Sequence, residues 1–390
     1  MATAFVEKHV RSYPDGRQLV TWRARYRDPS GKEHAKTFAR KVDAERYLTS
    51  VEADLLRGNW IDPDRGKTPL GDWAKRWLES KRSLKPKTRL GYESLLRSRV
   101  LPKLGDYPLA SIERIHVEQW ISQMQDEDLS SSRIRQAFNV LAAALDAAIA
   151  NGMIARNVAR GIDLPRLRPA KRRFLTQGQV AALANAIYPN YRVLVLVLAY
   201  SGLRWGEAIA LRRGRCDLLR RRLHVLESAT EVGGDLLWGS PKTHRVRSVS
   251  LPAFVCEELA QHLAAKVEDH PDALVFTTDS GMPVRHSDFL RYRWRSAVQA
   301  AGLPEGLTPH ELRHTAAALL INSGAGPKSI QAQLGHSTIV TTFDIYGHLF
   351  EGHLDDVMDR LDQAWRREAE TQSANPPAGH VVHLPRGGSS

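Results

Sequence analysis

Hydrophobic and polar positions alternate along the first part of the chain and then change to a helical spacing. Residues 5–40 alternate as β-strands do, most clearly from Leu19 to Tyr26, and the residues from Asp28 to Gly31 are typical of a turn. Apolar residues at helical spacing follow from Asp43 to Arg57. The pattern predicts a small unit of strands closed by one helix, and the turn-forming residues from Ile61 to Pro69 indicate a domain boundary after it.

Helical spacing dominates the segment after this boundary. Four helices are predicted there, at about Leu70–Lys81, Thr88–Val100, Ile115–Gln125 and Ser131–Asn151. A second linker, from Leu164 to Arg173, is basic and interrupted by prolines. The segment between the two linkers is therefore predicted to be an all-helical domain.

The segment after the second linker mixes helical and strand-like patterns. Its first predicted elements are an apolar helix over Tyr191–Tyr200, strands near Leu223–Leu226 and Arg245–Leu251, and helices near Ala253–Glu268 and Ser287–Ala301. Thr308 and Pro309 begin a further helix, and another starts near Lys328 and is closed by Gly335. Beyond these helices, an apolar stripe at helical spacing consists of Leu354, Val357, Met358, Leu361 and Trp365.

These elements predict a fold that is mainly α with small β-sheets (α+β), divided into three domains. We expect a three-stranded sheet plus a helix in residues 1–62, a helical domain in residues 66–160 and a mixed α/β domain in residues 171–365. Residues 371–390 are predicted to be a disordered tail. The apolar stripe can pack either on its own domain or on a neighbouring copy of the chain.

Composition makes nucleic acid the expected partner. Of the 390 residues 42% are hydrophobic, which is ordinary for a globular protein, but the net charge is +13 and the pI is near 9.9. A basic surplus of this size usually binds a polyanion, and its largest share, +7, falls between residues 66 and 170. The chain has no apolar run long enough to cross a membrane, no signal-peptide core and only two cysteines, so we expect a soluble cytoplasmic protein.

Two groups of basic residues are candidate DNA contacts. The first group opens a helix in the most positive segment and consists of Lys81, Arg82, Lys85, Lys87 and Arg89. This density of cations favours phosphate contact, with a solvated run of charge as the alternative. The second group shares one face of a predicted strand and consists of Arg23, Arg25 and Arg27. These arginines either read a DNA groove or form a charged, solvated face.

Four side chains suited to phosphoryl transfer lie close together in the sequence: His310, Arg313, His336 and Tyr346. Arginine matches two phosphate oxygens, histidine can donate or shuttle a proton near neutral pH, and tyrosine can act as a nucleophile. The helix that begins at Thr308 places His310 and Arg313 on one face. Each residue alone is more often a capping or core residue, but the combination favours chemistry on phosphate.

Two more basic residues stand at positions that can serve the same chemistry. Arg204 lies beside a glycine turn at a helix junction, where Glu207, one turn further on, can hold its guanidinium group. Lys242 lies in a Ser-Pro-Lys-Thr stretch at the entry to a predicted strand. A plain ion pair and a solvated lysine are the respective alternatives.

One motif in the same stretch points elsewhere. His310, Glu311 and His314 satisfy the H-E-x-x-H pattern of zinc proteases, in which two histidines bind the metal and the glutamate activates water. That site needs a third ligand, and the position where a histidine is expected in the extended motif holds Leu320. A zinc hydrolase is therefore a remote alternative, and we expect no metal.

The motifs together resemble those of a tyrosine recombinase of the phage-integrase type. They are Arg204 in GLRWGE, Lys242 in PKT, His310 and Arg313 in HELRH, His336 in LGHS and Tyr346 in DIYGH. All six positions occur in the order of the family, and none departs from its set. The resemblance implies an arm-type DNA-binding domain in residues 1–62, a helical core-site DNA-binding domain in residues 66–160 and a catalytic domain in residues 171–365.

The resemblance also implies a role for each of the six residues. Tyr346 would attack a DNA phosphodiester to form a 3′-phosphotyrosine, as in a type IB topoisomerase, without a cofactor. Arg204 and Arg313 would neutralise charge on the phosphate oxygens, and Glu207 would support them. His310 would assist removal of the tyrosine proton. Finally, His336 would donate to the phosphate, and Lys242 would protonate the leaving 5′ oxygen.

The expected function is site-specific recombination that integrates or excises a phage or other mobile element. The partners implied by the resemblance are double-stranded DNA attachment sites, other copies of the chain in a homotetramer, and an accessory excision or DNA-bending protein. The main alternative is a catalytically silent DNA-binding protein that has an architectural or regulatory role. The complete six-residue set favours the enzyme.

Overall fold

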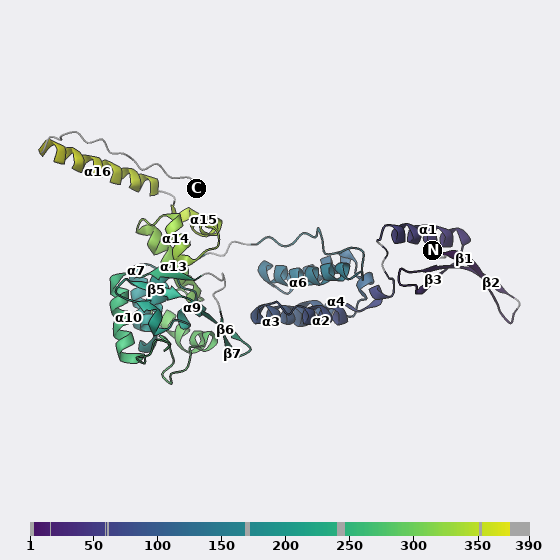
Figure 1. The fold of residues 1–390 in the computed structure, drawn as a ribbon, viewed down its shortest axis with the longest axis horizontal. Helices are drawn as coiled ribbons and strands as arrows, with labels where there is room; N and C mark the ends of the chain where they lie inside the picture. The colour runs from purple at the N-terminus through teal and green to yellow at the C-terminus, as the bar shows by residue number, and fades with distance from the viewer. Residues whose placement is uncertain are drawn as a thin grey trace. The chain divides into compact units, whose positions relative to one another are not determined.

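The computed structural model describes residues 4–15, 17–58, 60, 62–167, 172–239, 246–350 and 353–374. The chain divides into two compact units, Met1–Pro169 and Ala170–Ser390, which are drawn in Figure 1. In the part of the chain that the structure describes, no helix is both long and apolar enough to span a membrane.

The N-terminal part of the first unit is an antiparallel sheet with one helix along it (Figure 1). Its elements are β1 (Phe5–Ser12), β2 (Gln18–Arg27), β3 (Glu33–Phe38) and α1 (Lys41–Leu56), with the strands in the order β1-β2-β3. The alternation of strand β2 buries Ala24 and Tyr26 in a small core with Ala44, Leu48 and Val51 of α1. The three predicted strands and the predicted helix are therefore found, and helix α1 begins two residues earlier than the pattern indicated.

The second part of this unit is helical. Its helices are α2 (Leu70–Ser80), α3 (Pro86–Leu95), α4 (Leu101–Leu104), α5 (Arg114–Asp126) and α6 (Ser131–Ala150). Their apolar faces form a separate core, in which the indole of Trp73 on α2 donates a 2.7 Å hydrogen bond to the carbonyl of Ala144 on α6. The helix predicted over Thr88–Val100 is two segments, because α3 gives way at Leu96–Val100 to a π-helical turn.

The second unit combines helices with two small sheets. Its helices are α7 (Gln177–Ala186), α8 (Arg192–Ser201), α9 (Trp205–Ile209), α10 (Ala253–Lys266), α11 (His286–Phe289), α12 (Arg295–Ala300), α13 (Pro309–Asn322), α14 (Pro327–Leu334), α15 (Ile339–Tyr346) and α16 (His353–Ala374). One sheet has the order β4 (Cys216–Asp217), β5 (Arg222–Val225), β8 (Arg247–Ser250), and the other pairs β6 (Ser228–Val232) with β7 (Asp235–Gly239). The helices and sheets fit the predicted α+β class.

Helix α8 is the centre of the second unit. Every residue from Val193 to Ala199 is buried, which explains why its sequence is apolar all round rather than on one face. The helix ends at Gly202, whose backbone is left-handed with φ +70°. A Cβ on Gly202 would lie 2.4 Å from the side chain of Leu334, so glycine is needed there both for the turn and for the close approach of α14.

The C-terminal end of the second unit differs from the sequence expectation at one point. Tyr346 lies at the last position of helix α15, which Thr338 caps. The disordered tail was predicted from residue 371, but helix α16 continues to Ala374. Residues 375–390 lie outside the described part of the chain.

Candidate active site

The site is assembled where helices α8, α9, α13, α14 and α15 and strand β8 meet in the second unit. Arg204 stands at the N-cap of α9, two residues after the left-handed Gly202. The carboxylate of Glu207 accepts a 2.9 Å hydrogen bond from the backbone N–H of Arg204 and a 3.0 Å bond from its Nη1. The expected contact between Arg204 and Glu207 is therefore present, and it leaves the rest of the half-buried guanidinium group available to a phosphate.

Arg247 of strand β8 joins this pair, and the sequence reasoning missed it. Its Nη1 and Nη2 donate to the two carboxylate oxygens of Glu207 at 3.0 and 2.7 Å. Burial of Glu207 opposes ionisation, but the bonds from Arg247 and Arg204 outweigh it and hold the pKa of Glu207 at about 2. The sequence could not single out this arginine within a predicted strand, because its partner, Glu207, is distant in the sequence.

Arg313 lies on α13, whose first turn is fixed by the backbone N–H of Thr308 donating to Glu311 at 2.6 Å. The guanidinium group is only 4% exposed and donates to the carbonyl oxygens of Gly202 at 2.6 Å and Leu334 at 2.7 Å. Burial, followed by the nearby charge of Arg204, lowers its pKa to about 9, so Arg313 remains a cation at neutral pH. Backbone carbonyls from two other helix ends thus hold this cation in place.

The two histidines of α13 occupy different environments. His310 is exposed, whereas His314, one turn further along, is partly buried, and their rings meet edge to face at 5.1 Å. The Nδ1 atom of His314 lies 2.8 Å from the hydroxyl oxygen of Tyr346. Burial, and then the charge of His310, lowers the pKa of His314 to about 4, so the ring is neutral at pH 7.

Tyr346 is fully buried, with an exposed fraction of 0%, in a cluster with Ala317, Ile321, Ile330 and Leu334. Burial raises the pKa of its hydroxyl to about 12, although the charge of Arg313 acts in the opposite direction. The nucleophile expected from the sequence is therefore held in its protonated form.

His336 follows the left-handed Gly335 that ends α14. Its ring is almost parallel to that of Tyr346, with centroids 6.3 Å apart, and its Nδ1 lies 3.0 Å from the hydroxyl of Thr342. Burial, and then the charge of Arg313, lowers the pKa of His336 to about 4. A neutral ring held by Thr342 on one nitrogen can donate to a phosphate oxygen through the other.

Five of the six predicted catalytic residues are thus placed within this one unit, and Lys242 lies outside the described residues. Two residues of the zinc-protease pattern have other hydrogen-bond partners: Glu311 is bonded to Thr308, and His314 is bonded to Tyr346. The carboxylate that would activate water caps its own helix instead, which argues against that alternative.

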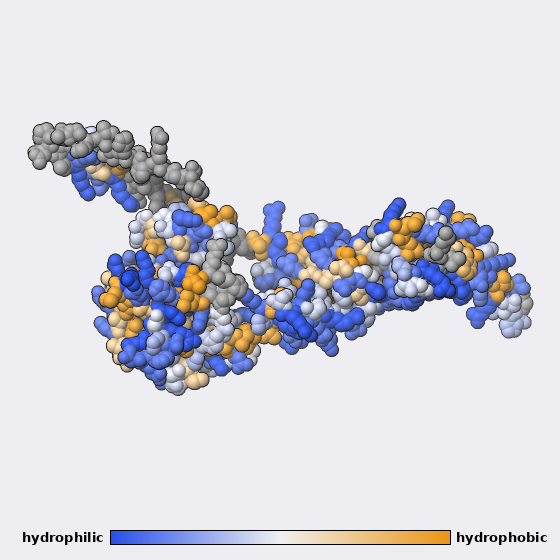
Figure 2. Space-filling view, viewed as in Figure 1, coloured by the Kyte–Doolittle hydropathy of each residue, from blue (hydrophilic) through white to orange (hydrophobic). Residues whose placement is uncertain are grey.

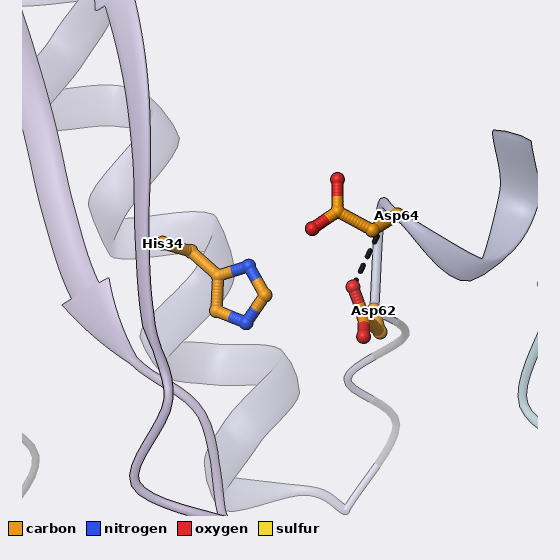
Figure 3. Close-up of side chains that lie close together, drawn as sticks. All are labelled: His34, Asp62 and Asp64. Atoms are coloured by element: carbon orange, nitrogen blue, oxygen red, sulfur yellow. Dashed lines mark hydrogen bonds between the residues drawn. The ribbon is translucent and has the colours of Figure 1, made fainter.

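Among the described residues, one group has the geometry to hold a metal ion, and it lies in the first unit. Its members are His34, Asp62 and Asp64, drawn in Figure 3, and their candidate ligand atoms lie within 4.8 Å of one another. Asp64 is already paired with Lys67 at 2.9 Å and Lys32 at 3.1 Å, and these lysines hold its pKa at about 2. Asp64 therefore belongs to an ion-pair network in which Lys32, just before β3, contacts the first linker.

The two groups of predicted DNA contacts differ in their surroundings. In the first group all but the partly exposed Arg89 are exposed, and Figure 2 shows hydrophilic residues over α2 and α3, where the group lies. In the second group, Arg25 pairs with Glu7 at 2.9 Å and with Glu33 at 2.8 Å. Arg27 approaches Glu33 at 3.7 Å, so ion pairs within the sheet occupy part of this arginine face.

Three family models match parts of this chain. The profile of the Phage integrase family matches residues 173–353, that of the phage integrase N-terminal SAM-like domain matches residues 70–125, and that of the phage integrase N-terminal domain matches residues 9–57. The integrase of Mycobacterium phage D29 is 30% identical over 317 residues, which cover 78% of this chain and 83% of that protein.

Two solved structures share the fold. The Tn1549 transposon integrase in complex with transposon right end DNA has a TM-score of 0.65 at 23% identity and covers 76% of this chain and 100% of that one. A λ integrase tetramer bound to a Holliday junction has a TM-score of 0.58 at 20% identity and covers 84% and 95%.

The fold, the family models and the related integrase thus define a DNA strand-transfer enzyme of the tyrosine recombinase class. The chain belongs to the phage integrase family of tyrosine site-specific recombinases.

Proposed function

We propose that this recombinase cleaves and rejoins DNA through a covalent bond between Tyr346 and a 3′ phosphate, and that it integrates or excises a phage or other mobile element. The observation that carries the proposal is the convergence of Tyr346, His336 and Arg313. The rings of Tyr346 and His336 face each other, and the charge of Arg313 acts on both. Arg313 lies on α13, Tyr346 lies on α15, and His336 lies in the turn after α14, so ordinary helix packing does not require them to meet.

In the proposed reaction Arg204 and Arg313 bind the non-bridging oxygens of the scissile phosphate. Both guanidinium groups are held by partners before DNA arrives, Arg204 by Glu207 and Arg313 by two carbonyls. Fixed donors stabilise the charge of the transition state without being reorganised during the reaction. His336 donates to the same phosphate, and Lys242 protonates the leaving 5′ oxygen.

His310 is proposed to meet DNA at the edge of the site. It is exposed one turn before His314, and its ring contacts that of His314. From this position it can approach the phosphate and influence the proton of Tyr346 through its neighbour.

We propose that three regions of the chain have three separate tasks. The sheet and helix within residues 1–62 would bind arm-type DNA, residues 66–160 would bind the core site, and residues 171–365 would hold the chemistry. The exposed cations from Lys81 to Lys87 support the second assignment, because among the described residues none of them forms an ion pair, and they lie on a helical surface rich in hydrophilic residues.

A homotetramer on DNA is the proposed working assembly, in the cytoplasm and with an accessory excision or DNA-bending protein. Helix α16 exposes Met358, Leu361 and Trp365 by 52, 63 and 68%. The same unit offers a groove of about 640 Å³, whose apolar lining includes Tyr200, Leu251, Phe254, Ala316, Leu319 and Leu320. The apolar face of α16 and the apolar groove are chemically complementary. In a cyclic arrangement of copies, the helix of each copy would bind the groove of its neighbour and bury both surfaces.

The test of the proposed reaction is covalent trapping. A suicide DNA substrate, nicked just downstream of the cleavage site, loses its 5′-hydroxyl fragment and leaves the protein attached to the 3′ end. The wild-type protein should give a protease-sensitive band of low mobility, and Tyr346→Phe should give none. Tyr292→Phe is the matched control, because Tyr292 is 60% exposed and should retain wild-type attachment.

Two outcomes of this test would count against the proposal. Attachment that persists in Tyr346→Phe would assign the nucleophile to another residue. A wild-type protein that binds its DNA sites but never becomes attached would instead favour the silent DNA-binding protein. A metal chelator added to the reaction distinguishes the recombinase from the zinc hydrolase, because only a zinc hydrolase would lose its activity.

A further inference from the structure

The buried hydroxyl of Tyr346 has one described hydrogen-bond partner, and it is a histidine outside the six-residue set. His314 Nδ1 lies 2.8 Å from the hydroxyl oxygen, and the two ring centroids are 5.8 Å apart. Tyr346 has no exposed surface, so hydroxide from the solvent cannot reach its proton while it is in this position. A group inside the protein has to accept that proton when the oxygen attacks.

We infer that His314 is a further catalytic residue, which accepts the phenolic proton of Tyr346 during attack on the phosphate. The inference rests on the proposed function, because it concerns the same nucleophile. It differs from the role that the family resemblance implies for His310: His310 is exposed, and the described hydrogen bond with the Tyr346 hydroxyl is made by His314.

The proton balance of the step is simple. The bond from the Tyr346 oxygen to phosphorus forms, and the bond from phosphorus to the 5′ oxygen breaks. The phenolic proton passes to Nδ1 of His314, and the leaving 5′ oxygen takes a proton from a different donor. In rejoining, the 5′ oxygen attacks the phosphotyrosine and its hydroxyl proton returns to the donor that supplied it, while His314 returns its proton to the departing tyrosine oxygen.

The surroundings of His314 are consistent with this direction of transfer. The charged and titratable groups that act on it are His310 and Arg313 from α13, Arg172 from the segment before α7, His336 after α14 and Tyr346 from α15. Burial and these charges keep the ring neutral at pH 7, with Nδ1 open to accept the hydroxyl proton. A phosphate bound between the arginines adds negative charge, which stabilises the imidazolium formed in the step.

The decisive variant is His314→Asn. An asparagine side chain places its amide oxygen near the position of Nδ1, so it can still accept a hydrogen bond from Tyr346 but cannot take a proton. Single-turnover attachment to the suicide substrate should fall by about 10²–10⁴ at pH 7. Binding of the same DNA should change less than about twofold, because the substitution leaves Arg204 and Arg313 in place.

The pH dependence distinguishes a proton acceptor from a packing residue. Wild-type attachment should be nearly constant from pH 6.5 to 9, because His314 is neutral throughout. In His314→Asn the rate should rise about tenfold per pH unit over the same range, because attack then depends on the small fraction of Tyr346 that is already ionised, and that fraction rises tenfold per pH unit below a pKa of about 12. A flat profile at a lower rate would mean that His314 only positions Tyr346. An unchanged rate would mean that His314 neither accepts the proton nor positions Tyr346. Each result overturns the inference.

Two further variants test the inference even if His314→Asn does not fold. His314→Gln is the second choice if the asparagine variant does not fold, as judged by its melting temperature and DNA affinity, and the same slope is expected. His310→Asn is the matched control on the same helix, and its profile should stay flat even if its rate falls. If wild type itself never attaches through Tyr346, the proposed function has failed; if wild type attaches and the His314 profile is flat, only this inference has failed.

Discussion

Glu207 and Arg247 form a buried two-point ion pair, with oxygen-to-nitrogen distances of 3.0 and 2.7 Å and no exposed surface on the Glu207 side chain. The same carboxylate holds Arg204. One anion therefore positions two cations, and a third, Arg313, stands nearby without an acidic partner among its described hydrogen bonds. The surplus of positive charge in a largely buried site is what a phosphodiester needs to bind there.

Removal of Glu207 should destabilise the protein strongly. Glu207→Ala leaves Arg247 buried without its counter-charge, which typically costs about 3–5 kcal/mol in the free energy of unfolding. Glu118→Ala is the matched control, because its 2.6 Å pair with Arg114 is solvent-exposed and should contribute at most about 1 kcal/mol. Denaturant unfolding of both variants measures the difference. Equal effects would show that the buried pair contributes nothing special.

The stability contribution of Glu207 should depend on pH in a defined direction. The pKa of this carboxyl is about 2 in the folded protein, below its ordinary value of 4.5. A lowered folded pKa means that the contribution is complete above pH 4.5 and is lost as the pH falls from 4.5 towards 2. The melting-temperature gap between wild type and Glu207→Gln should therefore shrink across that window. A gap that stays constant there would contradict the ion-pair explanation.

Gly202→Ala should impair both folding and cleavage. The new Cβ would lie 2.4 Å from Leu334, and the carbonyls of Gly202 and Leu334 are the two acceptors that hold Arg313. Gly233→Ala is the matched control, because Gly233 also has a positive φ, +60°, but nothing lies within 4 Å of its Cβ position. Both variants bear the backbone strain of about 1–2 kcal/mol. Only Gly202→Ala should also lose covalent attachment, and equal activity in the two would count against this account of Arg313.

Salt dependence of binding should reveal the phosphate contacts of the helical domain. Each cation that neutralises a phosphate contributes about 0.9 to the slope of log affinity against log salt concentration, so Lys85→Ala with Lys87→Ala should lower the slope by about 1.8. The measurement is a titration of core-site DNA at several salt concentrations. An unchanged slope would remove these two lysines from the interface.

Assembly should depend on the C-terminal helix. Deletion of residues 352–390 should abolish recombination and leave binding of one copy to a half-site intact, because α16 would dock on a neighbouring copy. Leu361→Ala with Trp365→Ala should reproduce the loss, whereas Arg366→Ala, on the same helix and 2.7 Å from Asp362, should not. Normal recombination by the truncated protein would show that α16 makes no essential contact with a neighbouring copy.

The sequence was most informative where local rules apply. Period-two alternation in β2, the apolar run of α8 and the glycine that ends each of α8 and α14 are all visible in a few neighbouring residues. Element boundaries were less certain, as the π-helical turn after Leu95 and the extension of α16 to Ala374 illustrate. Boundaries depend on how each helix end packs, which a single sequence window does not contain.

By itself the sequence determined the order of the elements, the positive charge and the set of residue types suited to phosphate chemistry, because spacing and composition are properties of the chain. Only the tertiary structure decided which residues meet. It placed Arg247 beside Glu207 across 40 positions and His314 beside Tyr346 across 32. It also buried Tyr346, the proposed nucleophile, and so raised the pKa of its hydroxyl, because that burial is produced by helices that are far apart in the sequence.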